Sequence, residues 1–171
     1  MLGALDTKVF YFVNKGLSCR VLDNVMPIVT FLGSGEFIFA LAILLLLVFR
    51  KKDKAIGGIL ILAGLTVSYY ATSVIKNLAG RPRPFIGLAD VNCMVAEQGF
   101  SFPSGHATAA FMAAFILARY FKRPFWLFFL ASLVAVSRVY LGVHYPIDVI
   151  AGSCLGLALG YVLSKFCLKP F

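Results

Sequence analysis

Long uncharged apolar runs constrain this chain of 171 residues more than any other feature of its sequence. Residues Phe37–Phe49 and Ile56–Ala71 contain no charged side chain. Hydrophobic residues make up 61% of the chain, whereas soluble domains usually reach about 45–50%. A helix needs about 20 mostly apolar residues to cross a bilayer. The sequence therefore predicts an all-α integral membrane protein, a single domain over residues 1–171 with a bundle of five or six transmembrane helices.

The apolar segments assign five crossings, at residues 35–50, 55–76, 104–121, 125–141 and 147–167. Residues 21–33 are apolar but too short, because a helix rises only about 1.5 Å per residue and the hydrocarbon core is about 30 Å thick. They form either a partial span or part of a longer crossing through Gly33-Ser34-Gly35. Residues 1–20 mix apolar and polar positions, which predicts a short amphipathic helix at the membrane interface.

The polar segment 77–103 separates two predicted crossings. Lipid-exposed irregular backbone is not tolerated in hydrocarbon, so this segment should lie outside the membrane. Helix directions then place the turn at 142–146 on the same side. The opposite side collects nine cations: Arg50, Lys51, Lys52, Lys54, Arg119, Lys122, Arg123, Lys165 and Lys169. The positive-inside rule assigns these to the cytoplasm, so 77–103 is predicted to be an extracytoplasmic loop. This distribution explains the net charge of +9 without a nucleic-acid-binding patch.

Three polar motifs fall on the extracytoplasmic side. They are KNLAGRPRP at Lys76–Pro84, PSGH at Pro103–His106, and SRVYLGVHYPID at Ser137–Asp148. They bring together cations that would repel one another unless an anion joined them. Arginine suits phosphate because its guanidinium donates two parallel hydrogen bonds. A helix that begins near Ser104-Gly105 adds free backbone N–H groups, and glycine permits close approach. The motifs therefore predict a site for a phosphoryl group.

The two histidines of the chain can supply the chemistry. His144 precedes Asp148 by four residues, so the carboxylate could hold one imidazole nitrogen and leave the other free to attack phosphorus. His106 could protonate the departing oxygen. Each residue alone also has a structural interpretation: His106 as an interfacial cap, Asp148 as a partner of a helix dipole, Lys76 as a snorkelling side chain. Their coincidence on one side of the membrane favours a catalytic site.

The spacing K-x6-RP, then PSGH, then SR-x5-H-x3-D resembles the type 2 phosphatidic acid phosphatase family, and more distantly the vanadium haloperoxidases. The resemblance covers roughly residues 20–167. It implies a helical membrane bundle and hydrolysis through a phosphohistidine without metal or cofactor. It implies His144 as the nucleophile, Asp148 as its partner and His106 as the general acid. The residues that it implies for phosphoryl binding are Lys76, Arg83, Ser104, Gly105 and Arg138.

The predicted function is that of a membrane lipid phosphatase at the outer face of a prokaryotic cytoplasmic membrane. Undecaprenyl diphosphate is the favoured substrate, with the lipid A 1-phosphate, phosphatidylglycerophosphate and phosphatidic acid as alternatives. A lipid phosphotransferase, or a non-catalytic lipid-binding or transport protein, remains open. The phosphorylated membrane lipid is the only partner expected. Arg81 is taken as an auxiliary cation and Glu36 as a capping or interfacial residue.

Overall fold

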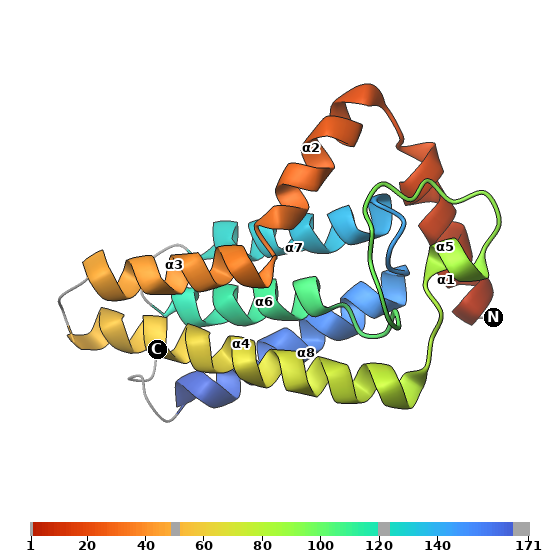
Figure 1. The fold of residues 1–171 in the computed structure, drawn as a ribbon. Coiled ribbons are helices and arrows are strands. Elements are labelled where there is room, and N and C mark those ends of the chain that lie inside the picture. The colour runs from red at the N-terminus through yellow and green to blue at the C-terminus, as the bar shows by residue number, and fades with distance from the viewer. Residues whose placement is uncertain (1, 49–51, 120–123, 166–171) are drawn as a thin grey trace.

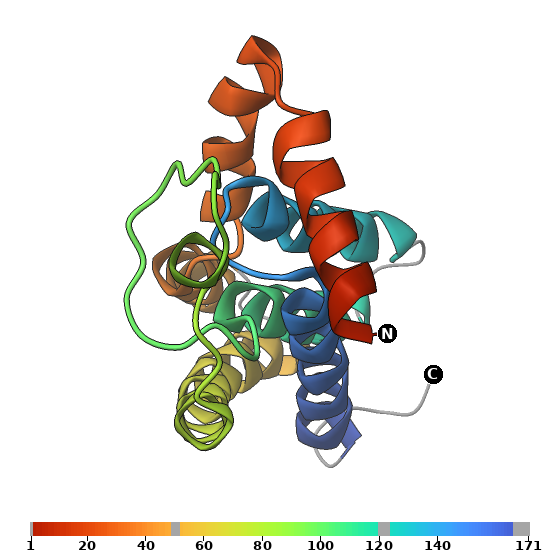
Figure 2. The same cartoon turned by 90° about the vertical axis from the view of Figure 1, so that its right-hand side faces the viewer.

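The computed structural model describes residues 2–48, 52–119 and 124–165, and every regular element within them is helical. The main helices are α3 (Gly35–Val48), α4 (Lys52–Ala79), α6 (Gly105–Ala118), α7 (Phe125–Tyr140) and α8 (Pro146–Lys165). Figure 1 shows them running along a common direction, and Figure 2, turned by 90°, shows α6 surrounded by α4, α7 and α8. Each of the five predicted crossings is a helix, and the all-α class is confirmed.

Fewer helices are long enough to cross a membrane than the sequence predicts. By length and composition, Ile56–Gly87 and Pro146–Lys165 can each cross a membrane. The helices α2 (Arg20–Phe31) and α3 together qualify as a third span, bent by 52°. The apolar helices α6 and α7 have 14 and 16 residues, which makes them shorter than a full span. The fold therefore supports two or three crossings among the described residues, and five or six are not confirmed by length alone.

The predicted helix directions are confirmed. Helices α4 and α7 end, and α6 and α8 begin, at the same end of the bundle (Figure 1). This end, which we call the motif end, carries all three sequence motifs. Cations expected at the other end include five that lie outside the described residues: Arg50, Lys51, Lys122, Arg123 and Lys169.

The N-terminal segment forms α1 (Leu2–Tyr11), followed by a π-helical turn at Phe12–Gly16. It packs across the motif end against α7 and α8 (Figure 1). Asn14 is fully buried there, and its Nδ2 donates to the carbonyl oxygens of Tyr140 at 2.7 Å and Asn92 at 2.9 Å. The expected helix is therefore present, and part of it is buried against the rest of the protein.

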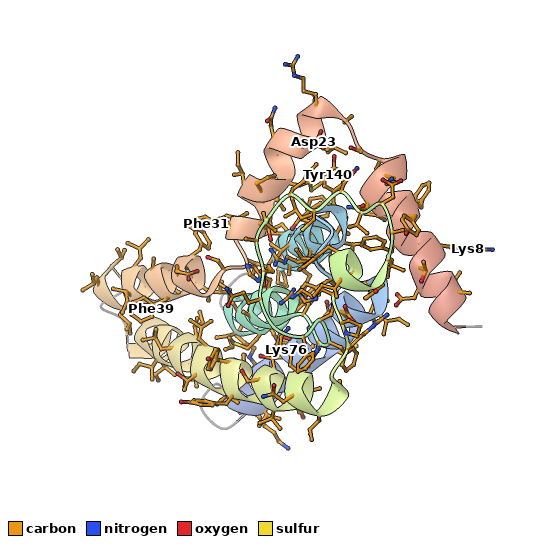
Figure 3. The ribbon with its side chains drawn as sticks, turned by 45° about the vertical axis from the view of Figure 1, so that its right-hand side comes forward. Lys8, Asp23, Phe31, Phe39, Lys76 and Tyr140 are labelled. Atoms are coloured by element: carbon orange, nitrogen blue, oxygen red, sulfur yellow. The ribbon has the colours of Figure 1, made fainter. Side chains whose placement is uncertain are left out.

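The segment predicted as a loop, residues 77–103, begins with the last turn of α4 and contains one short helix, α5 (Pro84–Gly87), that the sequence did not predict. Proline at the first helical position favours this turn because its fixed φ already suits a helix. The rest of the segment crosses the motif end as irregular chain, as Figure 3 shows beside the labelled Lys76 and Tyr140. It covers the place where the predicted site residues gather.

Helices α6 and α8 approach so closely that their backbones touch. A Cβ added at Gly156 would lie 2.3 Å from the carbonyl oxygen of Thr108, and one at Gly152 would lie 2.5 Å from that of Ser104. The Ser104 amide also donates to the Asp148 carbonyl oxygen at 3.0 Å. These contacts fix the first turns of α6 and α8, which carry His106 and Asp148, against each other.

Candidate active site

His144 lies in the turn between α7 and α8 and is 2% exposed. Its Nδ1 is 3.6 Å from Oδ2 of Asp148, and its Nε2 is 3.4 Å from Nη1 of Arg83. One ring nitrogen therefore faces the carboxylate that the spacing predicted, and the other faces a guanidinium. Burial is the main cause that lowers the pKa of His144 to about 4; the hydrogen bond with Asp148 acts to raise it, and the nearby cations act to lower it. The imidazole is then neutral at pH 7, the form that a nucleophile requires.

Asp148 is fully buried, and three hydrogen-bond donors hold its carboxylate. Its Oδ2 accepts hydrogen bonds from the hydroxyl of Ser101 at 2.5 Å and the amide of Tyr145 at 2.8 Å. Its Oδ1 accepts one from Nη1 of Arg81 at 2.6 Å. The carboxylate is thereby fixed with one edge toward His144. Sequence reasoning missed Ser101, whose only signal is its place two residues before the PSGH motif.

The three predicted phosphate-binding cations lie around His144, and the polar segment at Glu97–Phe100 occupies their donors. Nη2 of Arg83 is 3.1 Å from Oε2 of Glu97, and Nη2 of Arg138 pairs with the other oxygen of the same carboxylate. Nζ of Lys76 donates to the carbonyl oxygen of Phe100 at 2.6 Å. Two further backbone carbonyls of this segment accept from Arg83. The segment thus supplies an anion and dipoles where a phosphoryl group was predicted.

Glu97 was not singled out by the sequence analysis, because a lone glutamate in a polar loop has no distinctive spacing. Burial would raise the pKa of Glu97, but Arg138 and Arg83 outweigh that effect and lower it. The carboxylate is therefore ionised at neutral pH. The carboxylate lies between two buried guanidinium groups, at the place where the phosphoryl group is expected to bind.

The PSGH motif forms the beginning of α6, as predicted. The Ser104 hydroxyl is buried and caps the helix by accepting from the Ala107 amide at 3.4 Å. A Cβ at Gly105 would meet no protein atom within 4 Å, so protein packing does not require glycine there. His106 is partly buried, and the charges of Glu97, Arg138 and His144 act on it.

Arg81 pairs with two carboxylates, those of Asp6 and Asp148, and has no contact with the phosphate-binding cations. Glu36 lies in the first turn of α3, where it interacts with Ser34, the residue whose hydroxyl accepts from the Phe37 amide at 3.1 Å. Glu36 therefore lies beside the cap of α3, whose hydrogen bond Ser34 makes.

A groove between α3, α4 and α6 opens beside His106. Its lining is mainly apolar, with Phe39 from α3, Leu65 from α4 and Ala109 from α6. His106 and Gly105 form one part of its wall. Such a groove suits an acyl or isoprenoid chain, because apolar surface is favoured against apolar surface.

Comparison with known proteins decides the family. The family model for the PAP2 superfamily matches residues 57–170. The chain belongs to the PAP2 superfamily. This membership confirms the predicted family and the predicted class, a membrane lipid phosphatase. It does not test the roles assigned to individual residues, which stay predictions.

Three relatives show how PAP2 proteins of this kind are described. The chain is 31% identical over 157 residues to the "bacitracin transport permease protein BcrC" of Bacillus licheniformis, covering 90% of this chain and 76% of that protein. It is 32% identical over 162 residues to an undecaprenyl-diphosphatase of Sulfolobus acidocaldarius, covering 92% and 76%. The crystal structure of LpxE from Aquifex aeolicus superposes with a TM-score of 0.84 at 31% identity, covering 94% and 95%. The second name gives undecaprenyl diphosphate as the substrate of that relative, and the LpxE structure has the same fold as this chain.

Proposed function

We propose that this protein is an integral membrane lipid phosphatase that hydrolyses the phosphomonoester or pyrophosphate headgroup of a membrane lipid, with undecaprenyl diphosphate as the favoured substrate. The observation that carries the proposal is the setting of His144. Its Nδ1 faces Asp148 and its Nε2 faces the cations that can hold a phosphoryl group. A neutral imidazole fixed in this way can attack phosphorus with its free nitrogen.

In the proposed reaction, Lys76, Arg83 and Arg138 bind the nonbridging oxygens of the phosphoryl group. Nε2 of His144 forms a bond to phosphorus while the bond to the leaving oxygen breaks, and the Nδ1 proton stays on the ring, held by Asp148. His106 donates a proton to the leaving oxygen. His106, now neutral, takes a proton from water, and the resulting hydroxide displaces His144 and releases phosphate. Ser104 and Gly105 contribute the N-terminus of α6 to the phosphoryl oxygens.

We place the motif end at the extracytoplasmic face of an inner, cytoplasmic membrane, with all 171 residues in one membrane domain. Arg119 and Lys165, at the ends of α6 and α8 away from His144, support this orientation because cytoplasmic loops are rich in cations. Five or six transmembrane helices then form the bundle, with the short α6 buried among α4, α7 and α8. The groove beside His106 supports the entry of a lipid chain from the bilayer.

The test is phosphate release in detergent by the purified protein and its His144→Ala variant. The panel is undecaprenyl diphosphate, lipid A, phosphatidylglycerophosphate and phosphatidic acid, each with chelator. Lys8→Ala, an exposed substitution on α1, serves as the control. We expect release from at least one lipid, lost in His144→Ala and kept in Lys8→Ala. Release that survives in His144→Ala would refute the nucleophile. Appearance of phosphate on a second lipid would identify a phosphotransferase, and binding without release would favour lipid transport.

A further inference from the structure

Asp6 on α1 is a buried carboxylate that the three sequence motifs do not include. The residue is 3% exposed, and its side chain is completely buried. Its Oδ2 accepts from Nη2 of Arg81 at 2.5 Å, and its Oδ1 accepts from the amide of Ile147 at 2.9 Å. Ile147 is the residue directly before Asp148 in the first turn of α8. The carboxylate therefore joins the N-terminal helix to the element that carries the proposed partner of the nucleophile.

Arg81 continues this chain of contacts toward the site. Its Nη1 donates to Oδ1 of Asp148 at 2.6 Å, while Asp148 presents its other oxygen to His144. The guanidinium also lies over the ring of Tyr145, 3.9 Å from the ring centroid. Arg81 is thus held on three sides, and Asp6, Arg81, Asp148 and His144 form one continuous row of interacting groups.

The charges of this row explain why Asp6 matters. Arg81 alone would cancel the charge of Asp148 and weaken its attraction for the positive charge that develops on His144 during attack. Asp6 cancels the charge of Arg81 instead, so the three groups keep a net charge of about −1 at neutral pH. A buried charge also needs a partner of opposite charge. Without Asp6, Nη1 of Arg81 would keep Asp148 as its partner and Nη2 would lose its carboxylate.

From this geometry we infer that Asp6 is a positioning residue of the active site, which acts through Arg81 to orient Asp148 and to preserve its negative charge toward His144. The N-terminal helix is then part of the catalytic apparatus in addition to any contact with the membrane interface. The inference rests on the proposed function only in taking His144 as the nucleophile.

The effect is expected on the chemical step and on the titration of His144. The cations around His144 are Arg83, directly before α5, Arg138 on α7 and Lys76 on α4. The carboxylates that interact with it are Asp148 and Glu97, and His106 is a further titratable neighbour. Neutralising Asp6 makes the surroundings of the imidazole more positive. The pKa of His144 should then fall further, and attack should slow. Substrate binding should change little, because neither Asp6 nor Arg81 contacts the three cations.

The experiment compares Asp6→Asn and Asp6→Glu with a matched control, Asp23→Asn. Asp23 is a carboxylate on α2 that accepts from the Tyr140 hydroxyl at 2.5 Å and has no contact with the row. We expect Asp6→Asn to lower kcat by about tenfold, the scale of losses when an outer partner of a site residue is removed, with KM within about twofold. Asp6→Glu should recover most of kcat, and Asp23→Asn should leave kcat and KM unchanged.

A second measurement does not depend on turnover. The chain has two histidines, so 15N-labelled histidine gives two pairs of ring-nitrogen signals, which His106→Gln assigns. We expect the titration of His144 to move to lower pH in Asp6→Asn and to stay in place in Asp23→Asn. An unmoved titration, or a rise in KM with kcat unchanged, would overturn the inference. If the titration of His144 shifts in Asp6→Asn but the wild type releases no phosphate, the inference about Asp6 stands and the proposed function is refuted.

Discussion

Replacing Glu97 by glutamine tests whether this carboxylate competes with the substrate for the phosphate-binding cations. Glu97 bridges Arg83 and Arg138 with its two oxygens. A phosphoryl group that binds both guanidinium groups must displace it. Glutamine has nearly the same size but no charge, so Glu97→Gln removes much of the competition and leaves the packing of the segment intact.

The expected magnitude follows from the two contacts. Hydrogen bonds to charged groups contribute a net of about 1.5–3 kcal/mol each. Glutamine keeps one acceptor oxygen, so the substitution weakens the pairing by about 1–2 kcal/mol. Since about 1.4 kcal/mol corresponds to a factor of ten, an incoming anion should bind roughly tenfold more tightly. The added net positive charge of the site acts in the same direction.

The assay is inhibition of phosphate release by orthovanadate, a tetrahedral analogue of phosphate, with calorimetric titration of inorganic phosphate as the direct check. Asp90→Asn is the control, because Asp90 is an exposed carboxylate of the same segment that pairs with Lys15 instead. We expect the inhibition constant to fall about tenfold in Glu97→Gln and to stay unchanged in Asp90→Asn. An inhibition constant that rises would show that Glu97 holds the arginines in place for the phosphate, and an unchanged one would show no competition.

Two further predictions concern stability in detergent. Gly156→Ala places a methyl group 2.3 Å from the Thr108 carbonyl oxygen and should lower the free energy of unfolding by about 1–3 kcal/mol. A lowered midpoint of thermal unfolding checks this. The control is Gly3→Ala, whose Cβ meets nothing within 4 Å and which should leave the midpoint unchanged. Burial lowers the pKa of His144 from 6.5 to about 4, so stability present above pH 6.5 is lost as the pH falls toward 4, by about 3 kcal/mol. The drop in midpoint between pH 7 and pH 4.5 should be larger for the wild type than for His144→Gln, and equal drops would contradict the assigned burial.

The helices and the core of the site could be predicted because their signals are local or have fixed spacing. An apolar run predicts a helix wherever it occurs, and alternating helix directions then bring the motif residues to one end. His144 lies two residues before α8 and Asp148 lies in its first turn, so a spacing of four residues keeps the two side chains near each other. The PSGH motif likewise predicted a helix that begins near Ser104-Gly105, and α6 begins at Gly105 with Ser104 as its N-cap.

The residues that sequence reasoning missed make contacts over long stretches of chain. Asp6 and Arg81 are 75 positions apart, and Arg138 and Glu97 are 41 apart. A single aspartate in a mixed N-terminal segment has the same local pattern whether it faces water or a buried guanidinium. Apolar runs also do not fix the number of crossings, because a helix of 14 residues such as α6 can lie inside a bundle without spanning the bilayer by itself.

The contact between α6 and α8 has a consequence for protein engineering. Gly152 and Gly156 let the two backbones touch, so the proposed acid on α6 and the proposed partner of the nucleophile on α8 share one stiff frame. Residues 85–102 are joined to this frame by side-chain and main-chain hydrogen bonds, among them the one that the Ser101 hydroxyl donates to Asp148. Grafted segments that keep Ser101 can therefore be screened for new lipid preferences while Asp148 keeps its place beside His144.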